Sequence, residues 1–381
     1  MIDKRFNLST LPFIFAKMPE IMPALHIHND IRQSNTLPGW FYKSQETFEE
    51  AKEKIFATAW LYATDANVLS DPMSVFPLTL LPGVLDEPLV FTKDKDGKTR
   101  CLSNVCTHRG KIIVEEPGAG RMLTCGYHGR CFRLDGSFKS MPEFEAVENF
   151  PSPMDDLHQV PFEEWMGILF VSLNPRVSFE EMIRPIRERV GWLPLDSMTF
   201  APQNSPDYYI DANWALYCDN YLEGFHIPFV HPALNQALDF KNYQYEMFDY
   251  CNLQVGIAKE GEPCFDIPAG APDHGKKIYA YYFWLFPNLM LNFYPWGLSM
   301  NTVEPLSHNR TVIRYRTYYF GNTTFNREVN RIDQTELEDD TVVESVQKGL
   351  QSRFYQHGRF SPSQEQGVHH FHRLVSQFMN T

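Results

Sequence analysis

Two cysteines and two histidines follow a regular spacing in residues 104–132, NVCTHRGKIIVEEPGAGRMLTCGYHGRCF, and this stretch limits the possible folds most strongly. Cys106 and His108 form a C-x-H pair. Cys125 and His128 form a C-x-x-H pair, and 16 residues separate the two pairs. Thiolates and imidazoles at such short spacings are typical metal ligands. We therefore expect two tight loops that bend round a metal centre.

The mixed composition of each pair distinguishes between two kinds of metal centre. A structural Cys₂His₂ zinc site usually pairs like ligands, as C-x₂₋₄-C followed by H-x₃₋₅-H. Two thiolates on one iron and two neutral imidazoles on the other are the ligands of a Rieske-type [2Fe–2S] cluster. The alternation favours the cluster, and a zinc-stabilised binding module is the alternative. Cys101 and Cys131 lie outside the pairs, and we expect both to be small core residues.

A second group of candidate ligands lies in residues 213–234, NWALYCDNYLEGFHIPFVHPAL. Glu223 and His226 are three residues apart, so on a helix predicted near residues 213–226 they would share one face. Pro228 breaks that helix, and the chain can then turn back and bring His231 towards His226. Two histidines and a carboxylate form the facial triad of a non-haem Fe(II) oxygenase, which leaves coordination positions open for dioxygen.

The missing carboxylate is expected in TELEDDTVVESVQKGLQS, residues 335–352. On a helix, Asp339 shares a stripe with three apolar residues: Val343, Val346 and Leu350. Asp340 instead shares a polar, solvent-like face with Glu344 and Lys348. A carboxylate on an apolar stripe must be paired or bound to a metal, because burying it alone is costly. Asp339 is therefore the preferred ligand and Asp340 the alternative. Without a metal, both histidines would be core residues beside a surface acid.

Together the two motifs resemble those of the α-subunits of Rieske non-haem iron oxygenases, also called ring-hydroxylating oxygenases. The resemblance runs from about residue 38 to the end, and it includes the segments CTHRG, CGYHG and LDGSF. It implies that Cys106, His108, Cys125 and His128 bind the cluster. It further implies three ligands of a mononuclear iron: His226, His231 and Asp339.

The resemblance also implies roles for two polar residues near the iron. Glu223 falls on the carboxylate that lies between the two metal centres in this family, where Asp is usual. Asn220 matches an asparagine beside the iron. Family members form head-to-tail trimers in which the cluster of one subunit serves the iron of its neighbour. A homotrimer is therefore expected, with Glu223 near an interface.

The implied fold is α+β, with an all-β Rieske [2Fe–2S] domain and a helix-grip catalytic domain, in which an antiparallel sheet wraps round a long helix. We expect an N-terminal arm (1–38), a helix that packs on the catalytic domain (39–65), the Rieske domain (66–175) and the catalytic domain (176–381). The local patterns agree with this division. They predict helices at the start of 44–63 and over 178–193 and 337–351, and strands over 245–258, 277–303 and 311–320.

The implied activity is that of an oxygenase component that uses O₂ to hydroxylate a small organic substrate. Its electrons would come from NAD(P)H through a separate flavin and iron–sulfur reductase. Glu223 in place of Asp is typical of the choline, carnitine and glycine-betaine monooxygenase branch, so a quaternary ammonium or N-alkyl substrate with C–N cleavage is favoured. An aromatic-ring dioxygenase that forms a cis-diol is the alternative. A Rieske electron carrier with an inactive second domain is an alternative of another class.

Three features depart from the family pattern or invite another interpretation. Arg130 stands where tryptophan is frequent after the second cluster motif, and Ala215 stands where lysine is frequent. Three histidines near the end (His369, His370 and His372) could suggest a metal, but we expect them to be structural. The substrate, its site of oxidation and the reductase are not specified by the sequence.

Composition excludes several partners and suggests a compartment. The net charge is −13, which argues against nucleic acid and against an anionic membrane surface. Seven cysteines do not form an even disulfide framework, so we expect a reducing, cytoplasmic location. Residues 1–22 contain only a six-residue apolar run, too short for a signal peptide. The uncharged stretch 278–303 contains turn residues, and we expect buried strands there rather than a membrane span.

Overall fold

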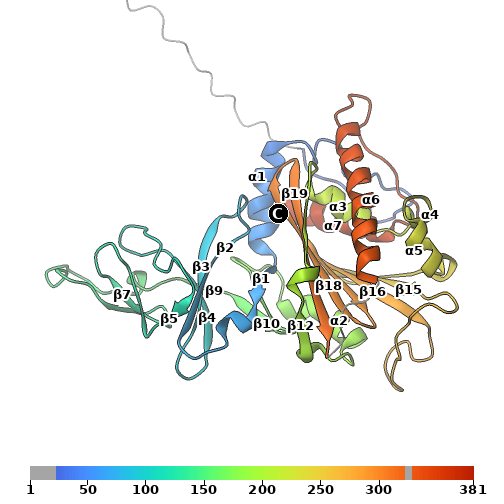
Figure 1. Cartoon of the computed structure of the whole chain (residues 1–381). Helices are drawn as coiled ribbons and strands as arrows, with labels where there is room; N and C mark the ends of the chain where they lie inside the picture. Colours follow the sequence, from blue (N-terminus) through green and yellow to red (C-terminus); the bar gives the residue numbers. More distant parts are fainter. Residues whose placement is uncertain (1–22, 322–327) are drawn as a thin grey trace, which may run out of the picture.

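The computed structural model describes residues 23–321 and 328–381, so the prediction about a signal peptide in the first 22 residues lies outside the described residues. A β-rich module occupies one end of the molecule, and a larger part built from helices and a long sheet occupies the other (Figure 1). This arrangement confirms the predicted fold class of an all-β domain joined to a mixed α and antiparallel β domain.

The β-rich module contains two antiparallel sheets that position the cysteine and histidine pairs. The larger has the strand order β5-β2-β3-β4-β9 and the smaller the order β6-β7-β8. Their strands are β2 (Ser74–Leu80), β3 (Glu87–Lys93), β4 (Thr99–Ser103), β5 (Gly118–Ala119), β6 (Met122–Thr124), β7 (Cys131–Arg133), β8 (Phe138–Ser140) and β9 (Gln159–Val160). Val90, Leu102 and Phe132 are fully buried between the sheets. The loops that carry these pairs join short strands at the edge of this core.

A third sheet and two helices connect the module to the rest of the chain. The sheet has the order β1-β11-β10, with β1 (Leu61–Asp65), β10 (Phe162–Trp165) and β11 (Ile168–Val171). Helix α1 (Gln45–Lys54) begins after Ser44, whose hydroxyl accepts a hydrogen bond from the Thr47 N–H at 3.1 Å. Helix α2 (Phe179–Val190) begins with the predicted capping box of Ser178 and Glu181.

The larger part of the molecule is built on an eight-stranded antiparallel sheet with the order β12-β19-β18-β17-β16-β15-β14, in which β13 also pairs with β19. The strands are β12 (Met198–Phe200), β13 (Asp207–Ile210), β14 (Gln244–Met247), β15 (Cys251–Ile257), β16 (Ile278–Leu285), β17 (Leu289–Tyr294), β18 (Gly297–Ser307) and β19 (Arg310–Phe320). The uncharged stretch 278–303 therefore forms buried strands, as predicted. Within the described residues, every helix is too short or too polar to cross a bilayer.

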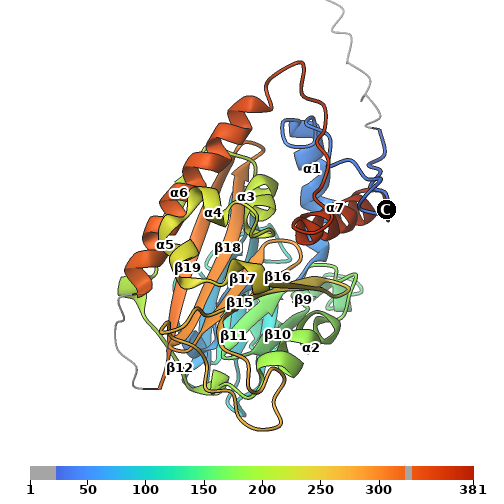
Figure 2. The same cartoon turned by 90° about the vertical axis from the view of Figure 1, so that its right-hand side faces the viewer.

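Helices α3 to α6 lie on one side of this sheet, with the long α6 running beside the strands (Figure 2). They are α3 (Trp214–Tyr221), α4 (Ile227–Val230), α5 (Pro232–Ala237) and α6 (Glu328–Gly349), and α7 (Gln366–Met379) follows them. Helix α7 contacts the sheet through Phe371, whose ring centroid lies 5.2 Å from that of Trp284. Short 3₁₀ helices complete the chain: Phe56–Thr58, Ala66–Leu69, Pro153–Asp155, Leu195–Ser197, Pro202–Asn204 and Phe240–Asn242.

The segment 44–63 is helical at its start, as predicted: α1 ends at Lys54 and the chain enters β1 at Leu61. One predicted helix ends earlier than expected. Helix α3 ends at Tyr221, so the prediction of a helix up to residue 226 was wrong. Gly224 lies in the turn after α3, where a Cβ would lie 3.2 Å from the Tyr243 ring and 3.3 Å from the Tyr245 hydroxyl. A side chain at this position would crowd both tyrosines, so the glycine suits the close approach of the turn to β14.

Candidate active site and metal centres

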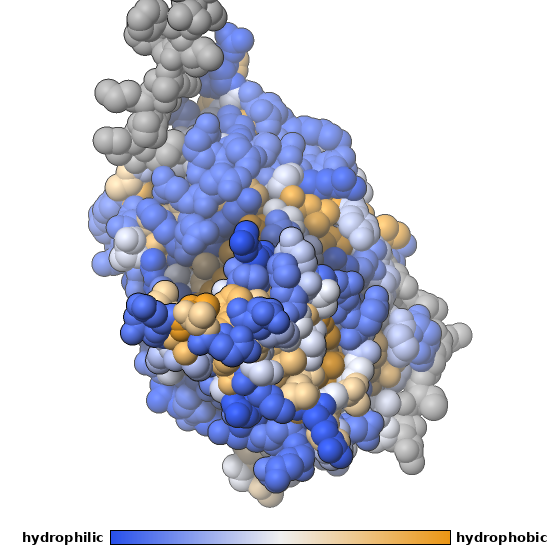
Figure 3. All heavy atoms as spheres, turned by 90° about the vertical axis from the view of Figure 1, so that its left-hand side faces the viewer, coloured by the Kyte–Doolittle hydropathy of each residue, from blue (hydrophilic) through white to orange (hydrophobic). Residues whose placement is uncertain are grey.

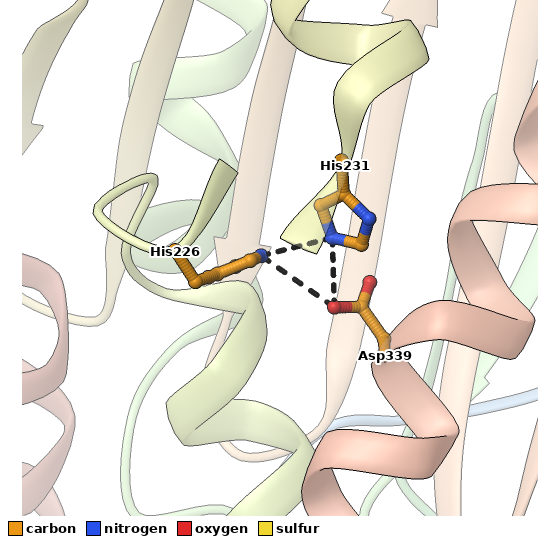
Figure 4. A group of neighbouring side chains, drawn as sticks. All are labelled: His226, His231 and Asp339. Atoms are coloured by element: carbon orange, nitrogen blue, oxygen red, sulfur yellow. Dashed lines mark hydrogen bonds and ion pairs between the residues drawn. The ribbon is translucent and has the colours of Figure 1, made fainter. Parts of the chain in front are cut away.

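Three side chains from two distant parts of the chain converge on one point (Figure 4). His226 lies just before α4, His231 lies between α4 and α5, and Asp339 projects from α6. The Nε2 atoms of the two histidines are 3.1 Å apart. The Asp339 Oδ1 atom lies 2.9 Å from His231 Nε2 and 3.5 Å from His226 Nε2. Two imidazoles and one carboxylate in this arrangement suit a ferrous ion with open positions.

A carboxylate contacts the outer nitrogen of each imidazole. His226 Nδ1 lies 2.7 Å from Glu223 Oε1, and His231 Nδ1 lies 2.8 Å from Glu338 Oε2. When Nδ1–H donates to the carboxylate, Nε2 keeps its lone pair for a metal. Burial by itself would lower the pKa of His231, but the carboxylates of Asp339 and Glu338 raise it above its usual value. The environment of both rings is therefore strongly anionic, as a divalent cation requires.

Glu223 and His226 interact, although they do not share a helix face. Because α3 ends at Tyr221, both residues lie in the turn before α4, and the expected helical i, i+3 arrangement was wrong. Pro228 lies in the first turn of α4, so it starts a new helix after the break. The Asn220 amide donates a hydrogen bond of 2.6 Å to Asp339 Oδ1. The structure therefore brings Asn220 beside the carboxylate of the group.

Helix α6 presents Asp339 to the two histidines and keeps Asp340 away from them. Val343 and Leu350 on the predicted stripe are buried, whereas Val346 is 44% exposed, so that part of the stripe was wrong. Asp340 also differs from expectation, because it does not face solvent. Its Oδ1 is buried without a hydrogen-bond partner among the described residues, and burial followed by the charge of Asp339 raises its pKa to about 7.

An aromatic cavity adjoins the three converging side chains. Seven tyrosines and one tryptophan line it: Tyr217, Tyr221, Tyr243, Tyr279, Tyr282, Tyr294, Tyr315 and Trp296. The Tyr294 ring stacks on Trp296 with centroids 5.1 Å apart, and it meets the edges of Tyr279 and Tyr282 at 6.1 and 5.9 Å. These four stacked or edge-on rings come from β16, β17 and the turn before β18, whereas the other tyrosines come from α3, β19 and the residue before β14.

The charged residues of the cavity are all acidic. Besides Asp339, Glu223 and Glu336 line it, and no lysine or arginine does so among the residues that the structure describes. Glu336 is 3% exposed and accepts hydrogen bonds from the hydroxyls of Tyr217 and Tyr315. Burial, followed by the charges of Asp340 and Asp339, raises the pKa of Glu336 well above its usual value. The described side chains that line the cavity therefore include three carboxyl groups and no lysine or arginine.

The four predicted cluster ligands lie on two facing loops of the β-rich module. Cys106 and Cys125 are 3% and 2% exposed, and the ring centroids of His108 and His128 are 4.8 Å apart. The cysteines thus lie on the inner side and the histidines on the outer side. Thiolates facing the core and imidazoles at the rim match the donor set of a Rieske cluster, which has one sulfur-ligated and one nitrogen-ligated iron.

The remaining cysteines and histidines have structural surroundings. None of the seven cysteines, all of which lie in the described part of the chain, forms a disulfide. Cys101 is buried as expected, but Cys131 is only half-buried. His369 Nε2 lies 2.8 Å from the His28 carbonyl, and His372 Nε2 lies 2.8 Å from Asp219. These contacts are consistent with the expected structural role of the C-terminal histidines.

Comparison with known proteins places both sites in one family. Residues 80–151 match the family described as Rieske [2Fe-2S] domain, and residues 195–381 match Ring hydroxylating alpha subunit (catalytic domain). The carnitine monooxygenase oxygenase subunit of Escherichia coli is 31% identical over 361 residues, which are 90% of this chain and 93% of that protein. The chain belongs to the Rieske ring-hydroxylating oxygenase family. The two matches lie within the predicted ranges 66–175 and 176–381, whose bounds stay predictions.

Other relatives of this Rieske oxygenase agree with the assignment. The chloroplastic choline monooxygenase of Arabidopsis thaliana is 26% identical over 98% of this chain and 89% of its own length. A solved quaternary ammonium Rieske monooxygenase superimposes with a TM-score of 0.74 at 26% identity, covering 93% of this chain and all of that one. Naphthalene 1,2-dioxygenase from Rhodococcus has the same fold, with a TM-score of 0.70 at 16% identity.

Family membership establishes the class of chemistry. The protein is an oxygenase that uses a Rieske [2Fe–2S] cluster, a mononuclear iron and O₂ on a small molecule. Sequence reasoning missed two acids in TELEDD, Glu336 and Glu338. A helical period counted back from Asp339 could have found Glu336. No sequence signal indicated Glu338, because its contact with His231 depends on how α6 crosses α5.

Proposed function

We propose that this oxygenase hydroxylates a carbon attached to nitrogen in a quaternary ammonium or other N-alkyl cation, and that C–N cleavage follows. The observation that carries the proposal is the cavity of aromatic rings and carboxyl groups beside the three converging ligands. Aromatic faces attract an alkylammonium group by roughly 1–2 kcal/mol each when water is excluded. The names of the relatives, carnitine and choline monooxygenase, agree with a cationic substrate.

The residues that would hold the metals follow from the donor geometry. His226, His231 and Asp339 would hold the mononuclear iron, and Cys106, His108, Cys125 and His128 would hold the cluster. When bound, these centres supply electrons one at a time and activate dioxygen for insertion into a C–H bond. The surrounding side chains do the rest of the work, which is to orient ligands, bind the substrate and exclude water.

The side chains around the iron site have separate tasks. Glu223 and Glu338 hold the Nδ1 protons of the two histidines and so keep each Nε2 directed at the metal. Asn220 fixes one oxygen of Asp339 through its amide N–H. The aromatic rings of Tyr294 and Trp296 bind the alkylammonium group and keep water from it. A substrate carbon that bears both hydroxyl and nitrogen then loses the amine and becomes an aldehyde.

We propose that the protein works as a homotrimer with a separate NAD(P)H-dependent reductase. The cluster loops and helices α4 to α6 lie at opposite ends of one subunit (Figure 1). Each site has exposed apolar side chains nearby: Tyr127 and Met154 beside the cluster loops, and Phe225, Phe229 and Leu337 beside the iron site. The end face of the Rieske module shows apolar atoms near its middle with hydrophilic atoms around them (Figure 3). Contact between these patches of two subunits would bring Glu223 between the centres.

The absence of disulfides among the described cysteines is consistent with a cytoplasmic location, which we also propose.

Sedimentation equilibrium at micromolar concentrations tests the trimer. Replacing Phe229 by Asp should dissociate it, because a charge would then be buried in the contact. Replacing Phe354 by Asp is the matched control, since Phe354 is also highly exposed and does not line the cavity. A monomeric wild-type protein would contradict the trimer.

A pair of isosteric ligands tests the charge preference of the cavity. Choline and 3,3-dimethylbutan-1-ol have nearly the same shape, but only choline carries a charge. Calorimetry on the iron-loaded, oxygen-free protein should show that choline-type cations bind at least about tenfold more tightly than their neutral analogues, which is about 1.4 kcal/mol. Binding of flat arenes without binding of any alkylammonium compound would instead support an aromatic-ring dioxygenase.

A further inference from the structure

The two loops that carry the proposed cluster ligands share a backbone hydrogen bond and a glycine with positive φ. They differ in how far the side chain of their last residue is exposed. In each loop the cysteine N–H donates to the carbonyl of the sixth residue, Cys106 to Lys111 at 2.9 Å and Cys125 to Arg130 at 2.8 Å. The fifth residue is a glycine with positive φ in both, Gly110 (72°) and Gly129 (74°). The sixth residue is a cation in both loops, but the Lys111 side chain is 36% exposed and that of Arg130 only 2%.

Arg130 is buried in a pocket that suits a guanidinium ion. Its carbon Cζ lies 4.9 Å from the ring centroid of Phe138, 5.4 Å from that of Phe150 and 5.7 Å from that of Phe132. One Nη donates to the Asp155 carboxylate at 2.7 Å. Its Nε is buried and has no hydrogen-bond partner among the described residues. A buried charge in apolar surroundings is weakly screened, so it acts over a longer distance than a surface charge.

Asp155 joins the loop of Arg130 to the other ligand loop. Its backbone carbonyl accepts a hydrogen bond from the Thr107 hydroxyl at 2.9 Å and another from Arg130 at 3.1 Å. Thr107 lies between the ligands Cys106 and His108. The Asp155 carboxylate also accepts hydrogen bonds from the Ser152 N–H and hydroxyl at 2.7 and 3.0 Å. Asp155, which lies outside both loops, therefore holds the two loops in a fixed position relative to each other.

We propose that the buried Arg130–Asp155 pair ties the two ligand loops together and sets the reduction potential of the cluster. The inference rests on the proposed ligand assignment. Reduction transfers one electron from a one-electron donor, such as the iron–sulfur or flavin centre of a reductase, and adds one negative charge to the cluster. The positive charge of Arg130 stabilises the reduced form and raises the potential. Asp155 opposes this effect, so the two members of the pair act in opposite directions.

Potentiometric titration of the cluster, followed by its visible absorbance and by electron paramagnetic resonance, tests the proposal without turnover. Arg130→Met should lower the midpoint potential by about 59 mV or more, a tenfold change in the equilibrium of a one-electron couple. Asp155→Asn removes the charge and keeps one of the two side-chain acceptor oxygens, and it should raise the potential. Arg130→Lys should keep most of the wild-type value. Arg121→Met is the matched control, because it removes an exposed cation from the same module and should change the potential little.

The sign of the two shifts separates an electrostatic role from a structural one. A general loosening of the loops would move both variants in the same direction, and that result would overturn the proposal. A midpoint potential of Arg130→Met equal to that of the Arg121→Met control would also overturn the proposal. If Arg130→Met loses its cluster, Asp155→Asn and Arg130→Lys decide, and an unchanged or lowered potential in Asp155→Asn overturns the electrostatic role. A wild-type protein without a Rieske spectrum would contradict the ligand assignment instead.

Discussion

Glu338 provides a direct test of how the proposed iron site is organised, because it contacts His231, a proposed iron ligand, on the side of the ring away from the proposed metal position. Its carboxylate lies 2.8 Å from His231 Nδ1, on the far side of the ring from Nε2. Partners of this kind orient a metal-binding imidazole and raise its basicity, and losing one typically reduces metal affinity 10–100-fold. For Glu338→Ala we therefore expect about 1.4–2.7 kcal/mol weaker iron binding.

The substitution should leave the fold intact. Glu338 is 27% exposed on α6, and alanine is the best helix former, so the helix itself should gain stability. Glu338→Gln keeps a hydrogen-bond acceptor without the charge, and its iron affinity should fall between those of the wild type and Glu338→Ala. Glu344→Ala is the control on the same helix. Glu344 accepts a hydrogen bond from the Asp211 N–H and does not contact His231.

Competition with a calibrated Fe(II) chelator under nitrogen measures the affinity of the mononuclear site, while the visible spectrum reports an intact cluster. The expected order of iron affinity is wild type and Glu344→Ala, then Glu338→Gln, then Glu338→Ala. If Glu338→Ala binds iron as tightly as the wild type, the contact between Glu338 and His231 does not organise the site. A loss of the cluster spectrum in the same variant would show that the effect is not local.

Four further predictions follow from the structure. Cys106→Ser should lose the brown colour of the cluster, and a variant that keeps the Rieske spectrum would refute the ligand assignment. His226→Ala should lose the mononuclear iron in metal analysis but keep two irons per chain in the cluster; full activity would contradict this. Tyr294→Leu should weaken binding of an alkylammonium ion by about 5–30-fold, from 1–2 kcal/mol of cation–π attraction, and leave its neutral analogue almost unchanged in calorimetry. Burial lowers the pKa of His370 from 6.5 to about 4, so below pH 6.5 the unfolded chain binds a proton that the folded chain does not. Stability should therefore fall between pH 6.5 and 4 by up to about 3 kcal/mol, and chemical denaturation at several pH values should show a smaller fall for His370→Gln.

Local patterns in the sequence were sufficient to identify the groups of candidate metal ligands, because the spacing within each group depends on short-range geometry. The prediction that His226 and His231 approach each other was correct, although the helix ends at Tyr221 and Pro228 starts α4 instead of causing the break. The choice of Asp339 over Asp340 as their neighbour was also correct. Their roles as iron ligands stay predictions. Ser44 and Ser178 were identified as helix caps because a cap needs only a few neighbouring residues.

Features that depend on long-range packing were not predictable in this way. The turn that follows α3 packs at Gly224 against Tyr243 and Tyr245, more than 15 residues away in sequence. The burial of Asp340 and Glu336 depends on where α6 lies on the sheet, which the local pattern does not specify. The pocket of Arg130 combines residues from β7, β8 and the segment before Asp155. The sequence showed that Arg130 departs from the family pattern, but it did not show that this side chain would be buried among aromatic rings.

The most direct test of the central claim is a single turnover of the purified protein with both metal centres loaded. The protein is reduced without oxygen, air is admitted, and the visible absorbance of the cluster is followed with and without candidate compounds. We predict that carnitine-, betaine- or choline-type cations accelerate cluster reoxidation and that an aldehyde forms in step with it. Acceleration by arenes alone, with a cis-diol as product, would contradict the assignment of a cationic N-alkyl substrate.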